Sequence, residues 1–213
     1  MTRTILAGLA AALLAGSGTA HAQRPQATRL PTRWMLNAHT VAAFGTTVRD
    51  PLAITTLRTG LGAGGGLTVG YLLTPHLTAF ASADVTKQSS RTIGLVGDFR
   101  LTHIEAGARV SLPVRSAPNL VPYALAAVGR RSLGTTVVDL EGNTAKIGLS
   151  GMTVGLGAGA QYFLSPALAL DAGATLGLGT FGGSVTINGV KTPVPDLQRS
   201  TVTRLMFGVS WYR

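Results

Sequence analysis

Apolar side chains alternate with small or polar side chains along eight stretches of the chain. In the second stretch, for example, Leu67 and Val69 alternate with Thr68 and with glycines. A repeat of two residues is that of a β-strand, whose successive side chains point to opposite faces of a sheet. The pattern predicts strands at about residues 34–45, 58–73, 77–87, 97–112, 122–131, 149–164, 167–179 and 201–213.

The connections between these predicted strands alternate in length. Short turns are expected at 74–76 and 165–166, with a longer one at 113–121. Long connections are expected at 46–57, 88–96, 132–148 and 180–200. Such alternation predicts antiparallel strands with all short turns at one end and all long loops at the other, and an even strand number places both termini at the turn end.

The first residues have the layout of a secretory signal. Arg3 precedes an apolar run from Ile5 to Ala15, and small residues then lead to Ala22. The run is too short to cross about 30 Å of hydrocarbon, which favours a cleaved signal over a membrane anchor. We therefore expect a signal peptide at 1–22, a flexible N-terminal segment at 23–33 and a single domain at 34–213.

The composition of the chain favours a membrane over water. Hydrophobic residues make up 46% and charged residues 12%, the latter about half the usual share of a globular domain. No stretch approaches the 18 consecutive apolar residues of a membrane helix, and cysteine is absent. In hydrocarbon every backbone polar group needs a partner, so a membrane sheet must close on itself. The prediction is an all-β, eight-stranded antiparallel transmembrane barrel, with short periplasmic turns and longer extracellular loops, in the outer membrane of a Gram-negative bacterium.

The two faces of the strands can be assigned from this reading. The glycine-rich faces are expected inside, and the apolar faces outside. Five aromatic residues are expected outside at the turn end, as an interfacial girdle: Trp34, Tyr71, Tyr123, Tyr162 and Trp211. A soluble barrel of the lipocalin kind would place its apolar face inside, and the small second face and the aromatic residues argue against it.

Three segments carry a resemblance to a known family. They are "YLLTPHLTAFASAD", "GLGAGAQYFLSPALALDAG" and the closing "RLMFGVSWYR". Together with the eight strands they resemble the small outer-membrane β-barrel family typified by OmpA and OmpX, in its barrel-only form. The resemblance implies insertion by the barrel assembly machinery, which reads a C-terminal signal Gly-x-x-aromatic-x-aromatic. Gly208 and Trp211 match that signal, whereas Arg213 stands where the last aromatic residue is usual.

The net charge of +10 comes from 18 Lys and Arg against 8 Asp and Glu. The export signal and the lack of a basic run argue against nucleic acid as a partner. The basic residues gather at the loop side, where lipopolysaccharide phosphates lie, and the planar Arg fork pairs well with phosphate. Expected contacts with these phosphates are Arg58, Arg91, Arg130, Arg131 and Arg199. The alternative for this set is a solvated loop face.

A second polar set falls on the predicted inner face. It comprises His39, Asp84, Glu105, Arg109, Asp171 and Arg204. Buried charges need partners, so we expect a paired network that plugs a narrow barrel. The predicted protein is a monomer without cofactor or metal, in contact with outer-membrane lipid and lipopolysaccharide. Its predicted role is structural or in surface interaction, without catalysis.

Two alternatives stay open at the level of sequence, a narrow channel and a lipid A-modifying enzyme. An enzyme of the deacylase kind needs a Ser and a His close together near the outer leaflet. His39 and His103 fall on the predicted inner face without a neighbouring Ser, and His76 falls in a predicted turn at the opposite end.

Overall fold

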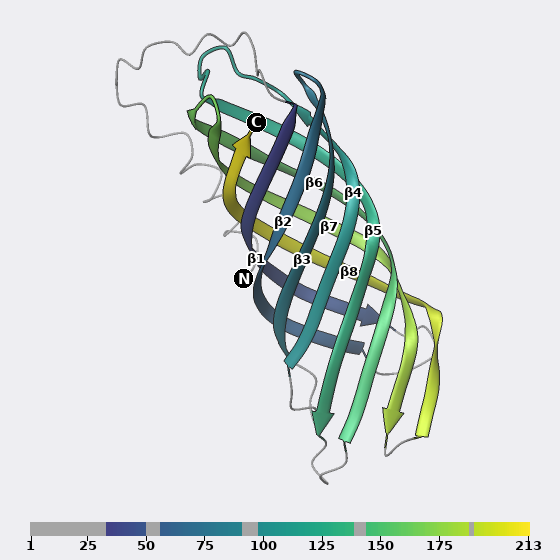
Figure 1. The fold of residues 1–213 in the computed structure, drawn as a ribbon. Helices are drawn as coiled ribbons and strands as arrows, with labels where there is room; N and C mark the ends of the chain where they lie inside the picture. Colours follow the sequence, from purple (N-terminus) through teal and green to yellow (C-terminus); the bar gives the residue numbers. More distant parts are fainter. Residues whose placement is uncertain (1–32, 50–55, 91–97, 139–143, 188–189) are drawn as a thin grey trace, which may run out of the picture.

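Eight antiparallel strands form a closed barrel in the computed structural model (Figure 1), as the sequence predicts. The structure describes residues 33–49, 56–90, 98–138, 144–187 and 190–213. The predicted signal peptide and nearly all of the segment 23–33 lie outside these residues. The strands are β1 (Trp34–Arg49), β2 (Thr56–Thr74), β3 (Leu77–Ser90), β4 (Asp98–Ser111), β5 (Leu120–Val138), β6 (Thr144–Ser165), β7 (Leu168–Ile187) and β8 (Val190–Tyr212).

The barrel closes because the last strand pairs with the first. Figure 1 shows the yellow β8 beside the purple β1. Trp211 lies opposite Leu36 in this pairing, and the backbones of Trp34 and Arg213 exchange two hydrogen bonds of 3.0 Å. The last residues of β8 and Arg213 therefore satisfy backbone groups of β1.

The outer surface of the wall is apolar and the inner surface is mostly small or polar. Exposed side chains include Leu61, Ile104 and Leu156, of which Ile104 is 63% exposed. The residues beside them in sequence point inward and are buried or half-buried. This inverts the arrangement of a soluble protein and confirms the predicted faces for most strands. Among the described residues, no helix has the length and apolarity needed to cross a membrane.

The short turns lie at one end, called the turn end, and the other connections lie at the loop end. At the turn between β2 and β3, the Thr74 hydroxyl accepts hydrogen bonds from the backbone N–H groups of His76 (3.3 Å) and Leu77 (3.0 Å). A Ser165 hydroxyl accepts one from Ala167 (3.3 Å) in the turn between β6 and β7. Both predicted tight turns are therefore present, each held by its own hydroxyl.

The strands at the loop end are longer than the sequence predicts. The expected loops at 132–148 and 180–200 are wrong, because β5 and β6 pair as far as Val138 and Thr144, and β7 and β8 as far as Ile187 and Val190. Figure 1 shows these strands reaching past β1 and β2. Beyond Gly134, β5 pairs with β6 alone, so its two faces no longer differ as the inside and outside of a barrel do. The alternation that marks the wall strands is lost there, although the backbone ladder continues.

The predicted position of Tyr123 is also wrong. Trp34, Tyr162 and Trp211 lie on the outer surface at the turn end, and Tyr71 is half-buried against Trp34 with ring centroids 5.0 Å apart. Tyr123 instead points inward and is 5% exposed. Both faces of β5 are apolar in this region, so alternation alone could not decide which of them faces inward.

Candidate functional site

The lumen contains an apolar cluster at its loop end. The cluster comprises Phe99, Leu101, Leu133, Leu149, Phe181 and Val202 from β4 to β8. All six side chains are buried, and Ile147 packs against them. We call this set the apolar plug, because large side chains from five strands fill the section of lumen that they face.

An ion-pair network lies next to the plug in the direction of the turn end. Arg204 of β8 donates to Asp84 of β3 at 2.5 Å, and to both carboxylate oxygens of Glu105 of β4 at 2.9 and 2.7 Å. His103 of β4 lies with Nδ1 3.3 Å from the other Asp84 oxygen. We call these four residues the Arg204 cluster. Its ion pairs cross the lumen from β8 to β3 and β4, so they tie together strands that are not neighbours in the sheet.

Arg131 lies between the plug and the Arg204 cluster, and this corrects its predicted position on the outer rim. Its side chain is fully buried. The guanidinium donates to the carbonyl (3.0 Å) and the hydroxyl of Ser200, and its Cζ lies 4.6 Å from the centroid of the Phe181 ring. Arg131 has the same parity along β5 as Tyr123, so one misassigned strand face explains both errors. A side chain in this place cannot reach an external phosphate.

A second polar network lies nearer the turn end. Arg109 donates to Asp171 (3.4 Å) and to the hydroxyl of Tyr212 (3.2 Å), and its Cζ lies 4.8 Å from the centroid of the Tyr123 ring. The Tyr123 hydroxyl donates to Asp171 at 2.7 Å, and the Gln161 amide donates to the same carboxylate at 2.7 Å. We call these five residues the Arg109 cluster. Asp171 is saturated with donors, as a buried carboxylate must be.

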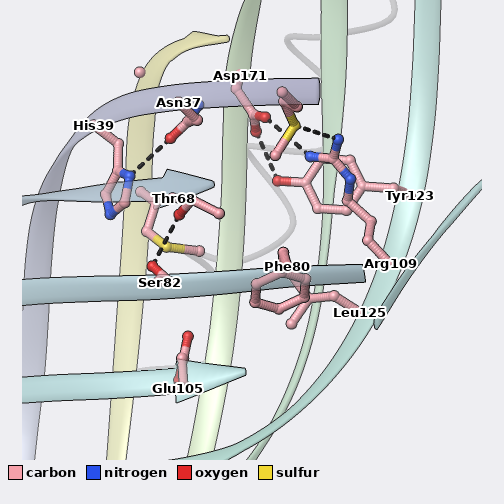
Figure 2. Close-up of a pocket in the computed structure, with 13 residues that line it drawn as sticks. Asn37, His39, Thr68, Phe80, Ser82, Glu105, Arg109, Tyr123, Leu125 and Asp171 are labelled. Carbon is pink, nitrogen blue, oxygen red and sulfur yellow. Dashed lines mark hydrogen bonds and ion pairs between the residues drawn. The ribbon is translucent and has the colours of Figure 1, made fainter. Parts of the chain in front are cut away.

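A small cavity separates the two clusters (Figure 2). Its volume is about 50 Å³, and Phe80, Leu125 and Met206 line it together with residues of both clusters. Figure 2 shows His39 turned toward Asn37, with 2.7 Å between Nδ1 and the amide oxygen, and Thr68 donating to Ser82 at 2.8 Å. The cavity has room for a few water molecules and for nothing as large as a sugar or an amino acid.

Inward-facing glycines leave the space in the lumen that these side chains occupy. A Cβ on Gly66 would lie 2.6 Å from the Asp84 Cβ and 2.7 Å from the His39 Nε2 atom. A Cβ on Gly159 would lie 2.5 Å from the Tyr123 hydroxyl. The glycine-rich inner face predicted from the sequence therefore provides the space for the large polar side chains.

The structure places all six residues of the predicted interior set inside the barrel. They are His39, Asp84, Glu105, Arg109, Asp171 and Arg204. They do not form one network: Asp84, Glu105 and Arg204 meet in one cluster, Arg109 and Asp171 in the other, and His39 pairs with Asn37. Tyr123 and Tyr212 also belong to the Arg109 cluster, and neither was among the residues predicted for the interior network. Tyr212 alternates with the apolar Val209 and Trp211 of the predicted outer face, which could have placed it inside, whereas no pattern in the sequence places Tyr123 there.

Of the other arginines predicted to contact phosphate, two are exposed on the outer surface. Arg130 is exposed and donates to the Ser150 hydroxyl at 3.0 Å, and Arg199 is exposed on β8. Arg58 pairs through its backbone with Thr47, and Arg91 lies outside the described residues.

The residues of the predicted C-terminal signal lie on opposite faces of β8. Trp211 is 45% exposed on the outer surface. Gly208 faces inward, and a Cβ there would lie 2.3 Å from the Ala38 carbonyl oxygen of β1. Glycine at this position is therefore required by the pairing of β8 with β1, whatever else recognises it.

The chemistry of the lumen is that of stable ion pairs and hydrogen bonds. Within the described ranges, no group of three or more His, Cys, Asp or Glu residues is placed to hold a metal ion. His103 is 1% exposed and lies under the apolar plug, so a substrate has no approach to it from the loop end.

A closed eight-stranded wall with an apolar outside and a polar inside is the architecture of outer-membrane barrels. The sequence profile of the outer membrane protein beta-barrel domain matches residues 9–194. The chain belongs to this family. Its turn end is therefore periplasmic, its loop end is extracellular, and the apolar wall meets lipid. This outer-membrane barrel matches no curated protein sequence.

Solved structures of other outer-membrane barrels are similar to this one. Neisserial surface protein A (NspA) has a TM-score of 0.57 and 19% identity, covering 84% of this chain and 97% of that chain. OprG from Pseudomonas aeruginosa has a TM-score of 0.51 and 10% identity, covering 84% of this chain and 95% of that chain. At these identities the likeness concerns the fold alone.

Proposed function

We propose that this outer-membrane barrel is a non-conducting and non-catalytic protein, with a role in the membrane itself or in contacts at its outer surface. The observation that carries the proposal is the filled lumen. The apolar plug and the Arg204 cluster occupy successive sections of it, and each consists of buried side chains from several strands.

The width of the barrel supports the absence of a conducting path. Eight strands leave an interior that side chains can fill. Here the cavity between the two clusters has about 50 Å³, enough for a few waters. An ion would have to pass an apolar section and then displace the ion pairs between Arg204 and its two carboxylates. Both steps are costly because apolar side chains offer no ligands and a broken buried pair leaves charges unpaired.

The positions of the histidines support a role without catalysis. A lipid A-modifying enzyme would act at the outer leaflet, near the extracellular end of the wall. His39 and His103 are buried in the lumen, and His76 lies in a periplasmic turn. None of the three can meet a lipid at the outer leaflet.

Single-channel recording of the purified protein in planar bilayers tests the first part of the proposal. We expect no stepwise current above that of protein-free detergent, whereas a large trimeric porin in the same bilayers gives clear steps. Reproducible steps from this protein would show that the lumen opens, and the narrow-channel alternative would replace the proposal.

Mass spectrometry of lipid A tests the second part. Lipid A from cells that overproduce the barrel is expected to have the same mass distribution as lipid A from cells with an empty vector. Loss of an acyl chain, or gain of one, would assign the protein to the lipid A-modifying alternative.

A further inference from the structure

A basic groove lies on the outside of the wall, at the extracellular ends of β4, β5 and β6. Its volume is about 490 Å³. The residues that line it are Arg100, Thr102, Ser132, Gly134, Thr135, Thr136 and Lys146. The proposed function uses none of these residues, and hydroxyl groups and cations dominate the lining.

The register of the three strands brings these side chains together. Thr102 lies opposite Ser132, and Ser132 lies opposite Ser150. In the same pairing of β5 with β6, Thr136 lies opposite Lys146. Thr102, Ser132 and Lys146 alternate with the inward-pointing residues of the wall, so they share the outer face, and Thr136 continues the row of Ser132 and Gly134 along β5.

Gly134 lines the groove, and Gly148 lies beside it on the neighbouring strand. Arg100 lies opposite Gly134, and Gly134 lies opposite Gly148. A Cβ at Gly134 or at Gly148 would meet no atom within 4 Å. Packing of the barrel therefore does not require glycine at either position, in contrast to the inward-facing Gly66. The effect of both glycines is to leave space beside Arg100 and Lys146.

The described residues that line the groove include two cations, Arg100 and Lys146, and no carboxylate. Arg100 and Lys146 are exposed, and within the described part of the chain neither forms an ion pair. The nearest exposed carboxylate along β4 is Asp98, which pairs with Lys87 at 2.7 Å. Arg130 adds a third exposed cation on the membrane side of the groove, where its guanidinium donates to Ser150. Such a site attracts an anion with several acceptor oxygens.

The surface directly below the groove is apolar. Ile104 and Met152 flank Arg130 in the same row of the sheet and are 63% and 64% exposed. Val128 and Val154 continue this surface toward the periplasm, and both are exposed. A molecule with an anionic head in the groove could therefore lay acyl chains along the wall. A cationic groove beside an apolar surface favours the binding of an amphiphile over that of a free anion.

We propose that the groove binds a phosphate group of an outer-leaflet lipid, the phosphorylated glucosamine head of lipopolysaccharide. Arg100 supplies a planar fork of donors, Lys146 supplies a point charge, and the Thr and Ser hydroxyls donate to the remaining phosphate oxygens. The acyl chains of the same lipid lie over Ile104 and Met152. The proposal depends on the orientation of the barrel in the membrane and is independent of whether the lumen conducts.

Titration of the folded protein in detergent micelles with diphosphoryl lipid A tests the proposal, with native mass spectrometry to count bound lipid. Wild type is expected to retain one lipid A molecule, and dephosphorylated lipid A is expected to bind at least about tenfold more weakly. The double variant Arg100→Gln/Lys146→Gln is expected to lose at least about tenfold in affinity, since two charge-assisted contacts are removed.

Two matched variants separate the groove from general surface charge. Arg199→Gln removes one exposed cation on β8, outside the groove, and is expected to leave affinity within about twofold. Gly148→Leu keeps every charge and adds a large exposed side chain beside Gly134 of the groove, and it is expected to weaken binding as the double variant does. Heat-modifiable migration on a gel confirms that each variant is folded, and all four substituted residues are exposed.

Three results would overturn the proposal. They are equal binding of dephosphorylated lipid A, unchanged binding by folded Gly148→Leu, and a loss in Arg199→Gln equal to that of the double variant. Inorganic phosphate serves as the competing probe. Displacement of lipid A by micromolar inorganic phosphate would assign the groove to the free anion instead of the lipid.

Discussion

At the scale of single residues, the three arginines buried in the described part of the lumen have different partners. Arg204 has two carboxylates, and Arg109 shares one carboxylate with neutral donors. Arg131 has the polar atoms of Ser200 and the face of the Phe181 ring. A buried charge without its partner is far more costly than the pair is stabilising. The loss of Arg204 should therefore be the most damaging change, because it strands two carboxylates at once.

Arg204→Met is expected to lower the free energy of unfolding by about 3–5 kcal/mol, the usual cost of breaking a buried ion pair. Urea unfolding in detergent, followed by heat-modifiable migration, measures the change. The exposed Arg199→Met is the control and should stay within about 0.5 kcal/mol of wild type. Neutralising the stranded acids as well, in Asp84→Asn/Glu105→Gln/Arg204→Met, should recover part of the loss. An Arg204→Met barrel as stable as the control would show that the network contributes little.

Two glycines of the wall should respond oppositely to the same substitution. Gly66→Ala is expected to destabilise the barrel by about 1–3 kcal/mol, because the new Cβ would lie 2.6 Å from the Ala83 carbonyl oxygen and close to Asp84 and His39. Gly134→Ala meets open space and should instead stabilise by about 0.4–1 kcal/mol through the unfolded chain. Urea unfolding of both variants and of wild type under the same conditions measures the two changes in stability. Equal effects at the two positions would contradict the close approach inside the barrel.

At the scale of elements, β8 has two tasks. It closes the sheet against β1, and it presents the aromatic residue of the predicted assembly signal to the outside. Gly208 and Trp211 serve these tasks from opposite faces of the strand. The backbone pairing of β8 is insensitive to the side chain at Arg213, which is exposed.

Trp211→Ala is expected to reduce the fraction of folded barrel in outer-membrane preparations several-fold, because an exposed aromatic residue of the closing strand is lost. Arg213→Phe restores the usual final aromatic residue and should leave this fraction unchanged or raise it. Heat-modifiable migration of membrane fractions gives the folded fraction in cells. Refolding of the purified chain in detergent separates recognition from stability, since recognition by the assembly machinery plays no part there.

The β5 strand shows where prediction from alternation ends. On β3 and β4 the two faces differ in polarity, so Asp84, Glu105 and Arg109 could be placed inside from the sequence alone. On β5 the apolar Leu125 and Val128 lie on opposite faces, and tertiary contacts such as the hydrogen bond of Tyr123 to Asp171 reveal which face is inside. That bond joins residues 48 positions apart, which no local pattern can report.

At the scale of the whole molecule, the lumen is closed by two sections in series. The apolar plug involves β4 to β8, whereas the Arg204 cluster joins β8 to β3 and β4. Because the sections are made by different interactions, removing one should leave the other closed.

Phe99→Ala/Phe181→Ala is therefore expected to lose stability without gaining conductance. Each truncation of a buried Phe costs about 3–5 kcal/mol, while the Arg204 cluster still fills the next section. Thermal unfolding and single-channel recording on the same preparation test both statements. If the double variant does not fold, the same two measurements are made on Phe99→Ala alone. Stepwise current from either variant would show that the plug is the only barrier.

The sequence by itself determined the barrel, because the requirement that buried backbone groups pair in lipid acts on every strand in the same way. Strand number, the apolar outside and the inward placement of Arg204 and Arg109 follow from a period of two residues, which is a local property. The tertiary structure decided which charges meet. Arg204 joins acids 120 and 99 positions away, and Arg130 and Arg131 fall on opposite sides of the wall. Register and barrel closure fix these contacts, and both depend on all eight strands at once.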